Sequence, residues 1–121
     1  MSKRLDGKRV VVTDATEFMG PDVVALFREE GATVVADTTD LRVPGRCEAL
    51  IAEAGKVDVL IANLAGGTTR IGVLDTDDHE MEDLYARMVL PLHRLTRAVL
   101  ALMAPSAKAL CICRQILEIG F

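Results

Sequence analysis

Residues 8–20, KRVVVTDATEFMG, constrain the fold of this chain more than any other stretch. The β-branched run from Val10 to Val12 is typical of a strand that is buried on both faces of a sheet. Small and polar residues follow and predict a tight turn, and Gly20 and Pro21 then open a segment with apolar residues at helical spacing. A strand, a tight turn and a helix in this order begin an α/β sheet, and ligands of such sheets usually bind at the first turn.

The rest of the chain repeats this alternation of strands and helices. Apolar, β-branched runs predict strands, and segments with apolar residues at helical spacing predict helices. The further predicted strands are residues 32–36, 57–62 and 109–113, and the further predicted helices are residues 46–54 and 77–103. Gly31 and Gly55 are expected to end the first two helices. We therefore predict one α/β domain over residues 1–121, a Rossmann-like doubly wound parallel sheet that is truncated to about four strands and three helices.

The longest predicted helix carries one continuous apolar stripe. Asp77 and Glu80 have the spacing of a capping box at its start, and Pro91 inside it removes one backbone donor and predicts a kink. The stripe consists of residues three or four positions apart: Leu84, Met88, Leu92, Leu95, Val99 and Leu102. Val89 and Leu100 widen the apolar face beyond what packing on a sheet needs. This wide face is either a subunit interface or a broad core face.

The composition argues against several classes of partner. The net charge of −4 and the scarcity of aromatic residues, with no Trp and a single Tyr, speak against a nucleic-acid surface. Arg87, Arg94 and Arg97 follow acidic residues on the same predicted helix, which indicates a solvated or salt-bridged face. The charged N-terminus has no apolar segment typical of a signal peptide, and no apolar run reaches the length of a membrane span.

The cysteine pattern favours reduced thiols. The three cysteines, Cys47, Cys111 and Cys113, are odd in number, and Cys-x-Cys is the spacing of neither a zinc knuckle nor a redox motif. Together with His79 and His93 they are too scattered to predict a metal site. We therefore expect a cytoplasmic protein without a bound metal.

Residues 58–66, DVLIANLAG, resemble a strand of the short-chain dehydrogenase/reductase family that ends in Asn-Asn-Ala-Gly, with Leu64 in place of the second Asn. The predicted long helix ends in RLTRAVLALM, which is similar to the interface helix of that family. The resemblance covers roughly Gly7 to Met103. It implies the N-terminal, nucleotide-binding half of an NAD(P)-dependent oxidoreductase.

The first turn departs from the pattern of that family. There it reads Thr-Gly, three residues and Gly-Ile-Gly, and the glycines let the backbone approach the pyrophosphate of the cofactor. Here residues 13–20 read TDATEFMG, so only Gly20 of the three glycines is present. Asp14 and Glu17 bring negative charge towards the expected phosphates, and Phe18 fills space where the backbone would be bare.

The same turn is also similar to that of halohydrin dehalogenases. In these relatives of the dehydrogenases, an aromatic residue helps to replace the cofactor site with a halide pocket. Thr13, Phe18 and Gly20 match that pattern in place. Three interpretations stay open: a cofactor site, a halide pocket, and a degenerate turn in which Phe18 is a core residue at the end of the sheet.

The resemblance also implies which residues would bind NAD. Asp37, about twenty residues after the turn, would bond a ribose hydroxyl and repel a 2′-phosphate, and its alternative role is to start an Asx turn. Asp40 and Leu41 are candidates for the family's Asp-Val beside the adenine, and in that case one helix and most of one strand are absent. The residues implied to bind the cofactor are Thr13, Phe18, Met19, Gly20, Asp37, Asn63, Ala65 and Gly66.

Catalysis in the family uses a Ser, a Tyr with a Lys four residues later, and an Asn on the long helix. The single Tyr, Tyr85, is followed four residues on by Val89, and the long helix contains no Asn. Ser106 precedes the expected position of the catalytic Ser. We therefore expect no catalytic residues in this chain, which would be a truncated or frameshifted N-terminal half without activity of its own.

The expected partners follow from the same resemblance. The parent enzyme would act on a small-molecule substrate with NAD, and the chain would form a homo-oligomer through the helix at residues 77–103. One alternative is a fragment of a cofactor-independent relative similar to the halohydrin dehalogenases. The other is a non-catalytic assembly partner that adds its long helix to a full-length homologue.

Overall fold

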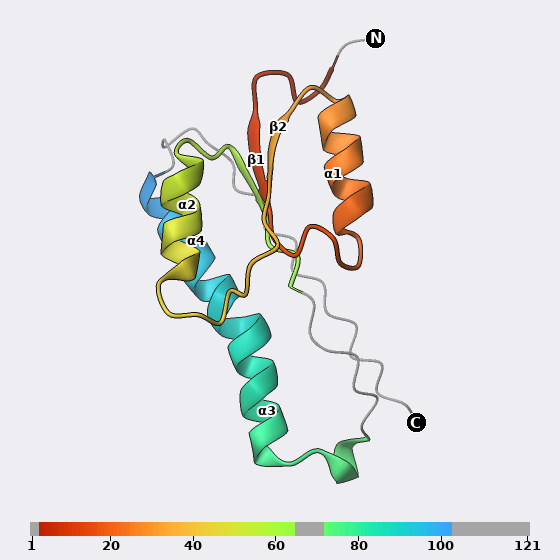
Figure 1. Cartoon of the computed structure of the whole chain (residues 1–121), viewed down its shortest axis with the longest axis vertical. Helices are drawn as coiled ribbons and strands as arrows, with labels where there is room; N and C mark the ends of the chain where they lie inside the picture. Colours follow the sequence, from red (N-terminus) through yellow and green to blue (C-terminus); the bar gives the residue numbers. More distant parts are fainter. Residues whose placement is uncertain (1–2, 65–71, 103–121) are drawn as a thin grey trace.

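The computed structural model describes residues 3–64 and 72–102 (Figure 1). Helices and strands alternate as predicted, and their bounds are β1 (Arg9–Val12), α1 (Gly20–Glu29), β2 (Thr33–Ala36), α2 (Arg46–Ala54), β3 (Val59–Ile61), α3 (Asp78–Leu84) and α4 (Leu90–Leu102). Gly31 and Gly55, which were expected to end the first two helices, have φ values of 91° and 71°. The predicted fourth strand, residues 109–113, lies outside the described residues.

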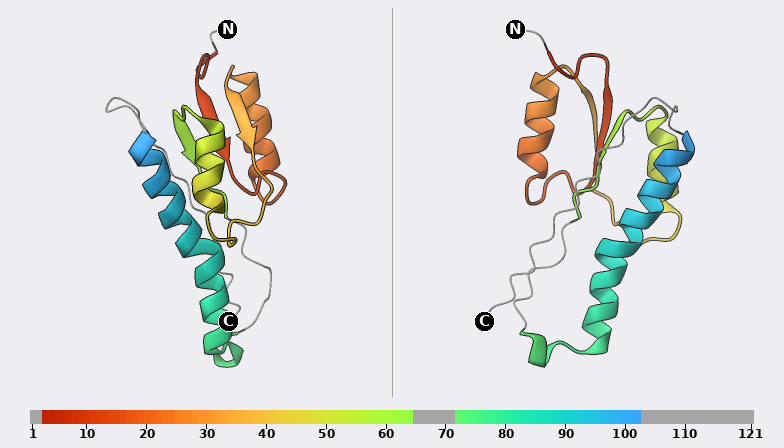
Figure 2. Two further views of the ribbon diagram at one scale, coloured as in Figure 1. Left: turned by 60° about the vertical axis from the view of Figure 1, so that its left-hand side comes forward. Right: turned by 180° about the vertical axis from the view of Figure 1, so that it is seen from behind.

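The sheet is parallel and covered on both faces. Its order is β2-β1-β3, so β1 is hydrogen-bonded on both sides. Val10 and Val12 of β1 pack in one apolar cluster with Val24 of α1, whereas Val11 packs in a second cluster with Leu95 of α4 and with residues of α2. Figure 2 shows α1 on one side of the sheet and α2 and α4 on the other. The doubly wound α/β fold is therefore confirmed.

The strand order explains the short stretch between the second strand and the second helix. Doubly wound sheets usually follow the order 3-2-1-4-5-6, in which the fourth strand lies beside the first. Here β3 takes that fourth place, because it pairs with β1 and is reached through α2 on the face opposite α1. Among the described residues no strand borders β2 on its outer side, where Thr33 and Ala36 are exposed. This agrees with the interpretation that one helix and most of one strand are absent before Asp40.

The long helix is continuous but changes its geometry in the middle. The capping box is confirmed: the Glu80 backbone N–H donates to Asp77 Oδ1 (2.9 Å), and the Asp77 N–H donates to Glu80 Oε2 (3.3 Å). Residues Tyr85–Val89 form a π-helical turn between α3 and α4. The deviation precedes Pro91, because proline has no N–H to continue the α-helical hydrogen bonds of that turn.

The apolar stripe of this helix is only partly buried. Met88, Leu95 and Val99 are buried, but Leu102, which was predicted to belong to the stripe, is 57% exposed. It follows the last buried residue of the stripe and lies at the end of the described helix. Val89 and Leu100 are 48% and 58% exposed, so the interpretation of the wide apolar face as a core face is wrong for both. In the structure of the single chain, the side chains of Val89 and Leu100 are in contact with solvent.

Two further properties concern the described residues as a whole. Over 3–64 and 72–102, none of the helices has both the length and the apolar content that a bilayer crossing requires. In the same ranges, no three His, Cys, Asp or Glu side chains are grouped as ligands of one metal ion. Cys47 is buried and reduced, and burial raises the pKa of its thiol.

Candidate functional site

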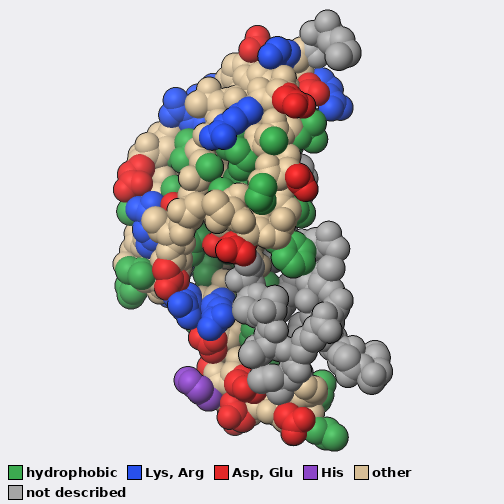
Figure 3. Space-filling view, turned by 45° about the vertical axis from the view of Figure 1, so that its right-hand side comes forward, with side chains coloured by type: hydrophobic (Ala, Val, Ile, Leu, Met, Phe, Trp, Pro, Cys, Tyr) green, Lys and Arg blue, Asp and Glu red, His purple; other side chains and the backbone are tan. Residues whose placement is uncertain are grey.

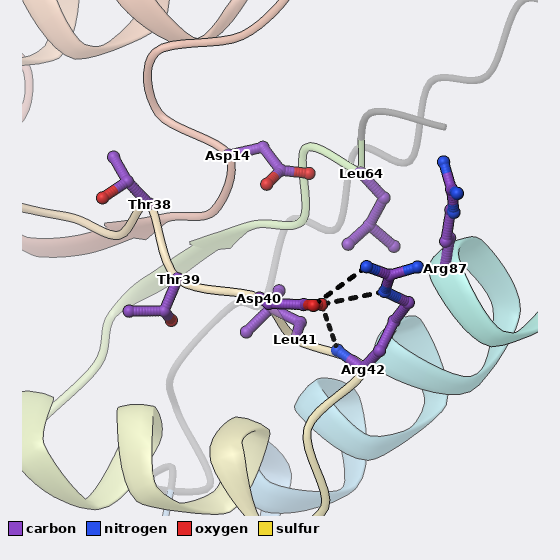
Figure 4. Close-up of a pocket in the computed structure, with 8 residues that line it drawn as sticks. All are labelled: Asp14, Thr38, Thr39, Asp40, Leu41, Arg42, Leu64 and Arg87. Carbon is purple, nitrogen blue, oxygen red and sulfur yellow. Dashed lines mark hydrogen bonds and ion pairs between the residues drawn. The ribbon is translucent and has the colours of Figure 1, made fainter. Parts of the chain in front are cut away.

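A cavity of about 330 Å³ lies at the carboxyl ends of the three strands. Its lining comes from the segments that follow each strand and from the π-helical turn, and consists of Asp14, Thr38, Thr39, Asp40, Leu41, Arg42, Leu64 and Arg87 (Figure 4). Parallel α/β sheets bind ligands in this position, because connections from neighbouring strands diverge there and leave a crevice. This cavity is therefore the candidate site.

The turn after β1 keeps the backbone conformation that glycines favour. Asp14 and Phe18, which stand where the family's pattern has glycine, have φ values of 44° and 55°. Asp is among the few non-glycine residues that adopt this left-handed conformation readily, whereas a bulky residue such as Phe is strained in it. The Glu17 N–H donates to the Asp14 carbonyl (2.9 Å), and the Gly20 N–H donates to the Glu17 carbonyl (2.8 Å). These bonds close the turn.

Gly20 is required by packing within the protein. A Cβ atom at this position would lie 2.6 Å from the Ala15 carbonyl oxygen and 2.7 Å from that of Asp14. The start of α1 therefore rests directly on the backbone of the preceding turn. Met19 precedes the helix and is half-buried beside it.

Thr13 and Asn63 join the turns after β1 and β3. The Thr13 hydroxyl donates to the Asn63 carbonyl (2.7 Å), and Asn63 Nδ2 donates to the carbonyls of Asp14 (3.0 Å) and Glu17 (2.9 Å). Both side chains are buried. Asn63 Oδ1 is buried and has no hydrogen-bond partner among the described residues. These contacts give Thr13 and Asn63 a structural role that holds the two turns together.

The carboxylate of Asp37 accepts hydrogen bonds from other groups of the protein. Its carboxylate accepts hydrogen bonds from the Thr39 N–H (3.2 Å) and hydroxyl (2.9 Å) and from Arg46 Nη2 (3.1 Å). The side chain is only 5% exposed. Hydrogen bonds to Asp37 and Glu53 raise the pKa of Arg46. The geometry is that of the Asx turn that was one of the two alternatives for Asp37.

Four charged side chains form a ladder between the loop after β2 and the long helix. Arg42 lies 3.0 Å from Asp40 and 3.5 Å from Asp83, and Arg87 lies 2.8 Å from Asp83. The hydrogen bond from Arg42 lowers the pKa of the Asp40 carboxyl. Figure 4 shows Arg42 bonded to Asp40 beside Leu41 at the edge of the cavity. The ladder confirms that Arg87 belongs to a salt-bridged face.

The predicted site residues are only partly brought together. Phe18 is 58% exposed, so the interpretation of this side chain as a core residue is wrong. Ala65 and Gly66 lie outside the described residues. Residues that line the cavity without having been predicted to do so include Thr38, Leu64 and Arg87. For Arg87, the nearest sequence signal was the spacing of acidic and basic residues on the long helix.

Comparisons with known proteins agree with this geometry. The family model described as short chain dehydrogenase matches residues 2–113. No curated protein sequence matches the chain significantly. Two solved structures are similar in fold, at 17% sequence identity each. A short-chain dehydrogenase/reductase of the glucose/ribitol dehydrogenase type from Brucella melitensis has a TM-score of 0.80, and the match covers 92% of this chain. One from Serratia marcescens BCRC 10948 has a TM-score of 0.76, and the match covers 88%.

The match spans only part of these relatives. It covers 58% of the Brucella protein and 55% of the Serratia protein. The family model covers more than half of the chain, and the chain therefore belongs to the short-chain dehydrogenase/reductase family.

Proposed function

We propose that this chain is the nucleotide-binding part of an NAD-dependent oxidoreductase and that its cavity holds the adenosine end of the cofactor. The observation that carries the proposal is the cavity of about 330 Å³ at the carboxyl ends of β1, β2 and β3. Its volume is in the range of small-molecule sites. Leu41 and Leu64 supply apolar contact for a base, and Thr38 and Asp14 supply polar groups for a ribose.

The residues present fit the adenosine part of NAD. The cavity has an apolar wall and a polar wall, and the adjoining turn keeps the left-handed conformations at Asp14 and Phe18 that a glycine turn would have. Family members usually use NAD or NADP. When bound, the nicotinamide would supply hydride transfer.

We propose that the chain of 121 residues binds nucleotide without turning over a substrate. Its single Tyr, Tyr85, is followed at the fourth position by Val89, so the Tyr and Lys pair of the family is absent from the sequence. Tyr85 lies on the π-helical turn and is 52% exposed. We expect no dehydrogenase activity from this chain alone, and the substrate would be a small molecule bound by the rest of the parent enzyme.

The test is binding of 5′-AMP, which is the part of NAD that the cavity would hold, measured by calorimetry. Thr38 lines the cavity and is exposed, so Thr38→Trp would fill the site from its rim. Thr33 is exposed at the opposite end of β2, so Thr33→Trp is the matched control. We expect saturable binding that Thr38→Trp abolishes and Thr33→Trp leaves unchanged. The absence of binding, or equal binding by the two variants, contradicts the proposal.

A second candidate function is the halide pocket of the halohydrin dehalogenases, and Phe18 favours it. This aromatic side chain replaces a glycine, is 58% exposed and accepts a strained backbone conformation. Line broadening of ³⁵Cl⁻ in NMR spectra would detect a halide site. Broadening that Phe18→Ala removes, in a chain that does not bind 5′-AMP, supports this candidate over the first.

We further propose that the chain associates through the face of its long helix that projects away from the sheet. Among the described residues this helix has five exposed large apolar side chains. Leu102 continues the stripe that contains the buried residues, and the other four are proposed to form this face: Met81 (57%), Tyr85 (52%), Val89 (48%) and Leu100 (58%). Burial of such side chains in an oligomer removes apolar surface from water. The partner is either a second copy of the chain or a full-length homologue.

A further inference from the structure

We propose that the outer edge of β2 binds the same edge of a second copy of the chain, so that the two sheets join into one across a twofold axis. This surface lies apart from the exposed apolar face of the long helix, and it contains none of the groups proposed to hold a nucleotide. The inference therefore stands or falls independently of the proposed nucleotide function.

The outer edge of β2 presents backbone groups that can bind another strand. Over residues 3–64 and 72–102, β2 pairs with β1 and with no other strand. The N–H groups of Thr33 and Asp37 donate to backbone carbonyls on the side of β1, at 2.8 and 2.9 Å. Backbone groups of successive strand residues point to opposite sides, so the N–H and C=O groups of Val34 and Ala36 point away from β1. Such a row of groups is a template for a further strand.

The side chains of β2 do not protect this edge. Edge strands commonly carry charged residues or Pro, which prevent pairing with other chains. β2 reads TVVA and has neither, and Thr33 and Ala36 at its two ends are exposed. On the face that Figure 3 shows, hydrophobic side chains and backbone are exposed between the charged groups in the upper half of the molecule, which holds the sheet. Another strand can therefore approach β2.

A second copy fits this edge because the strand that it can offer is β2 itself. In the part of the chain that the structure describes, β1 is bonded on both sides, and Leu60 and Ile61 of β3 are only 1% exposed. Contact between the same edge of two copies is symmetric about a twofold axis, which makes the two β2 strands antiparallel. In doubly wound sheets a strand usually fills the place beside β2, so the helices on the two faces leave room for one there.

The residues of β2 suit an antiparallel pair that is centred on Val35. In this register Val34 of each copy lies opposite Ala36 of the other, and each of these pairs exchanges both of its N–H···O bonds. Val34 and Val35 already pack against the apolar clusters on the two faces of the sheet, so pairing would continue both clusters across the axis. The carboxylate of Asp37, at the end of the edge, lies 3.1 Å from the guanidinium of Arg46, so pairing brings no uncompensated charges together.

The test is amide hydrogen exchange followed by NMR, with the mass measured by light scattering in the same samples. As the concentration of the chain rises and the dimer forms, we expect the exchange of the Val34 and Ala36 amides to slow by roughly tenfold or more, because both enter hydrogen bonds. The amides of Thr33 and Asp37 are the internal controls. They are bonded towards β1 in the single chain, so their protection should not depend on concentration.

Variants separate this edge from the face of the long helix. All are made in a chain that also carries Val89→Glu and Leu100→Glu, so that the helix face is blocked. Ala36→Pro removes an outward N–H, which an edge strand tolerates, and Ala36→Lys adds a charge to the edge. Ala52→Lys, on the exposed side of α2, is the matched control. We expect a dimer that both Ala36 variants convert to a monomer and that Ala52→Lys preserves. Protection of the amides bonded towards β1 shows that each variant is folded.

Three results would overturn the inference. The first is rapid exchange of the Val34 and Ala36 amides at every concentration. The second is protection of these amides in a chain of monomeric mass, because another part of the same chain would then occupy the edge. The third is a dimer whose mass is unchanged by both Ala36→Pro and Ala36→Lys, because the copies would then be joined elsewhere.

Discussion

The guanidinium of Arg46 lies 3.1 Å from the carboxylate of Asp37, and this pair joins the first turn of α2 to the end of β2. Thr39 completes the cluster, because its hydroxyl donates to Asp37 and accepts from Arg46 Nε (2.7 Å). The loop between β2 and α2 is thereby held by side chains at both of its ends. Its conformation in turn places Thr38, Asp40 and the residues after them along the cavity (Figure 4).

Removal of the Asp37 carboxylate should destabilise the protein. Asp37→Ala leaves the N–H of Thr39 and the guanidinium of Arg46 without their acceptor, and we expect a loss of about 1–3 kcal/mol in the free energy of unfolding. Urea denaturation measures this value. Thr38→Ala, at the exposed neighbouring position, is the control and should change it by less than about 0.5 kcal/mol. Equal stability of the two variants would show that the cluster does not stabilise the loop.

Substitution of Gly20 should have a large effect. The Cβ atom of Gly20→Ala would lie 2.6 Å from a carbonyl oxygen of the preceding turn, so the backbone must shift, at a cost of about 3 kcal/mol. Gly72→Ala is the matched control, because nothing lies within 4 Å of its Cβ position. Thermal unfolding followed by circular dichroism compares them. A Gly20→Ala variant as stable as Gly72→Ala contradicts the packing of α1 on the turn.

Phe18→Gly should stabilise the protein, because glycine relieves the strain of a φ value of 55°. The expected net gain is about 0.5 kcal/mol, because the strain that is relieved, about 1–2 kcal/mol, exceeds the entropic cost of glycine, about 0.5–1 kcal/mol. Met19→Gly is the control: Met19 has a φ of −88°, and glycine there should cost roughly 1 kcal/mol through the entropy of the unfolded chain. The midpoint of chemical denaturation should thus move to a higher denaturant concentration in Phe18→Gly and to a lower one in Met19→Gly. A shift in the same direction would mean that the turn does not hold Phe18 in a strained conformation.

The pair of Asp40 and Arg42 predicts a dependence of stability on pH. The hydrogen bond from Arg42 lowers the pKa of Asp40 in the folded state, so below about pH 4 the unfolded chain takes up a proton that the folded chain does not. The stabilisation by Asp40 is therefore present at neutral pH and is lost as the pH falls through the lowered pKa. Urea midpoints of the unmodified chain and of Asp40→Asn, measured from pH 7 to pH 3, should converge towards acid. A constant difference over this range would speak against the pair.

The exposed apolar side chains of the long helix predict self-association. In Val89→Glu and in Leu100→Glu, charges on this face would have to be desolvated in an interface, so we expect a shift towards the monomer. Light scattering after size-exclusion chromatography measures the mass. Leu74→Glu, at an apolar residue that is 99% exposed outside the helix, is the control and should leave the mass unchanged. A strictly monomeric unmodified chain contradicts the proposed interface.

Most of the secondary structure could be predicted because its signals are local. Residues 46–54 form α2 as predicted, since Gly45 and Gly55 bound it with φ values of 80° and 71°. The capping box of Asp77 and Glu80 is likewise a contact between near neighbours in the sequence. The π-helical turn could not be predicted, because its hydrogen bonds depend on how the helix accommodates Pro91 against the rest of the fold.

Less of the candidate site than of the secondary structure could be predicted from the sequence. Resemblance to a family pointed to the turn after β1, but the exposure of Phe18 and the occupied state of Asp37 depend on contacts from other elements. Arg42 and Arg87 both contact Asp83, although α2, β3 and α3 lie between the two arginines in the chain. Such charged residues follow no periodicity in the sequence from which their salt-bridge partners could be predicted.

By itself, the sequence determined the alternation of strands and helices, the membership of residues 10–12 in a fully buried strand, and the departures from the glycine pattern of the first turn. Each of these follows from side-chain types at neighbouring positions. The tertiary structure alone decided that Asp14 lines the cavity and that Asp37 accepts hydrogen bonds from Thr39 and Arg46. The physical reason is that the environment of Asp14 and Asp37 is set by groups that the fold brings to the carboxyl end of the sheet from distant parts of the chain.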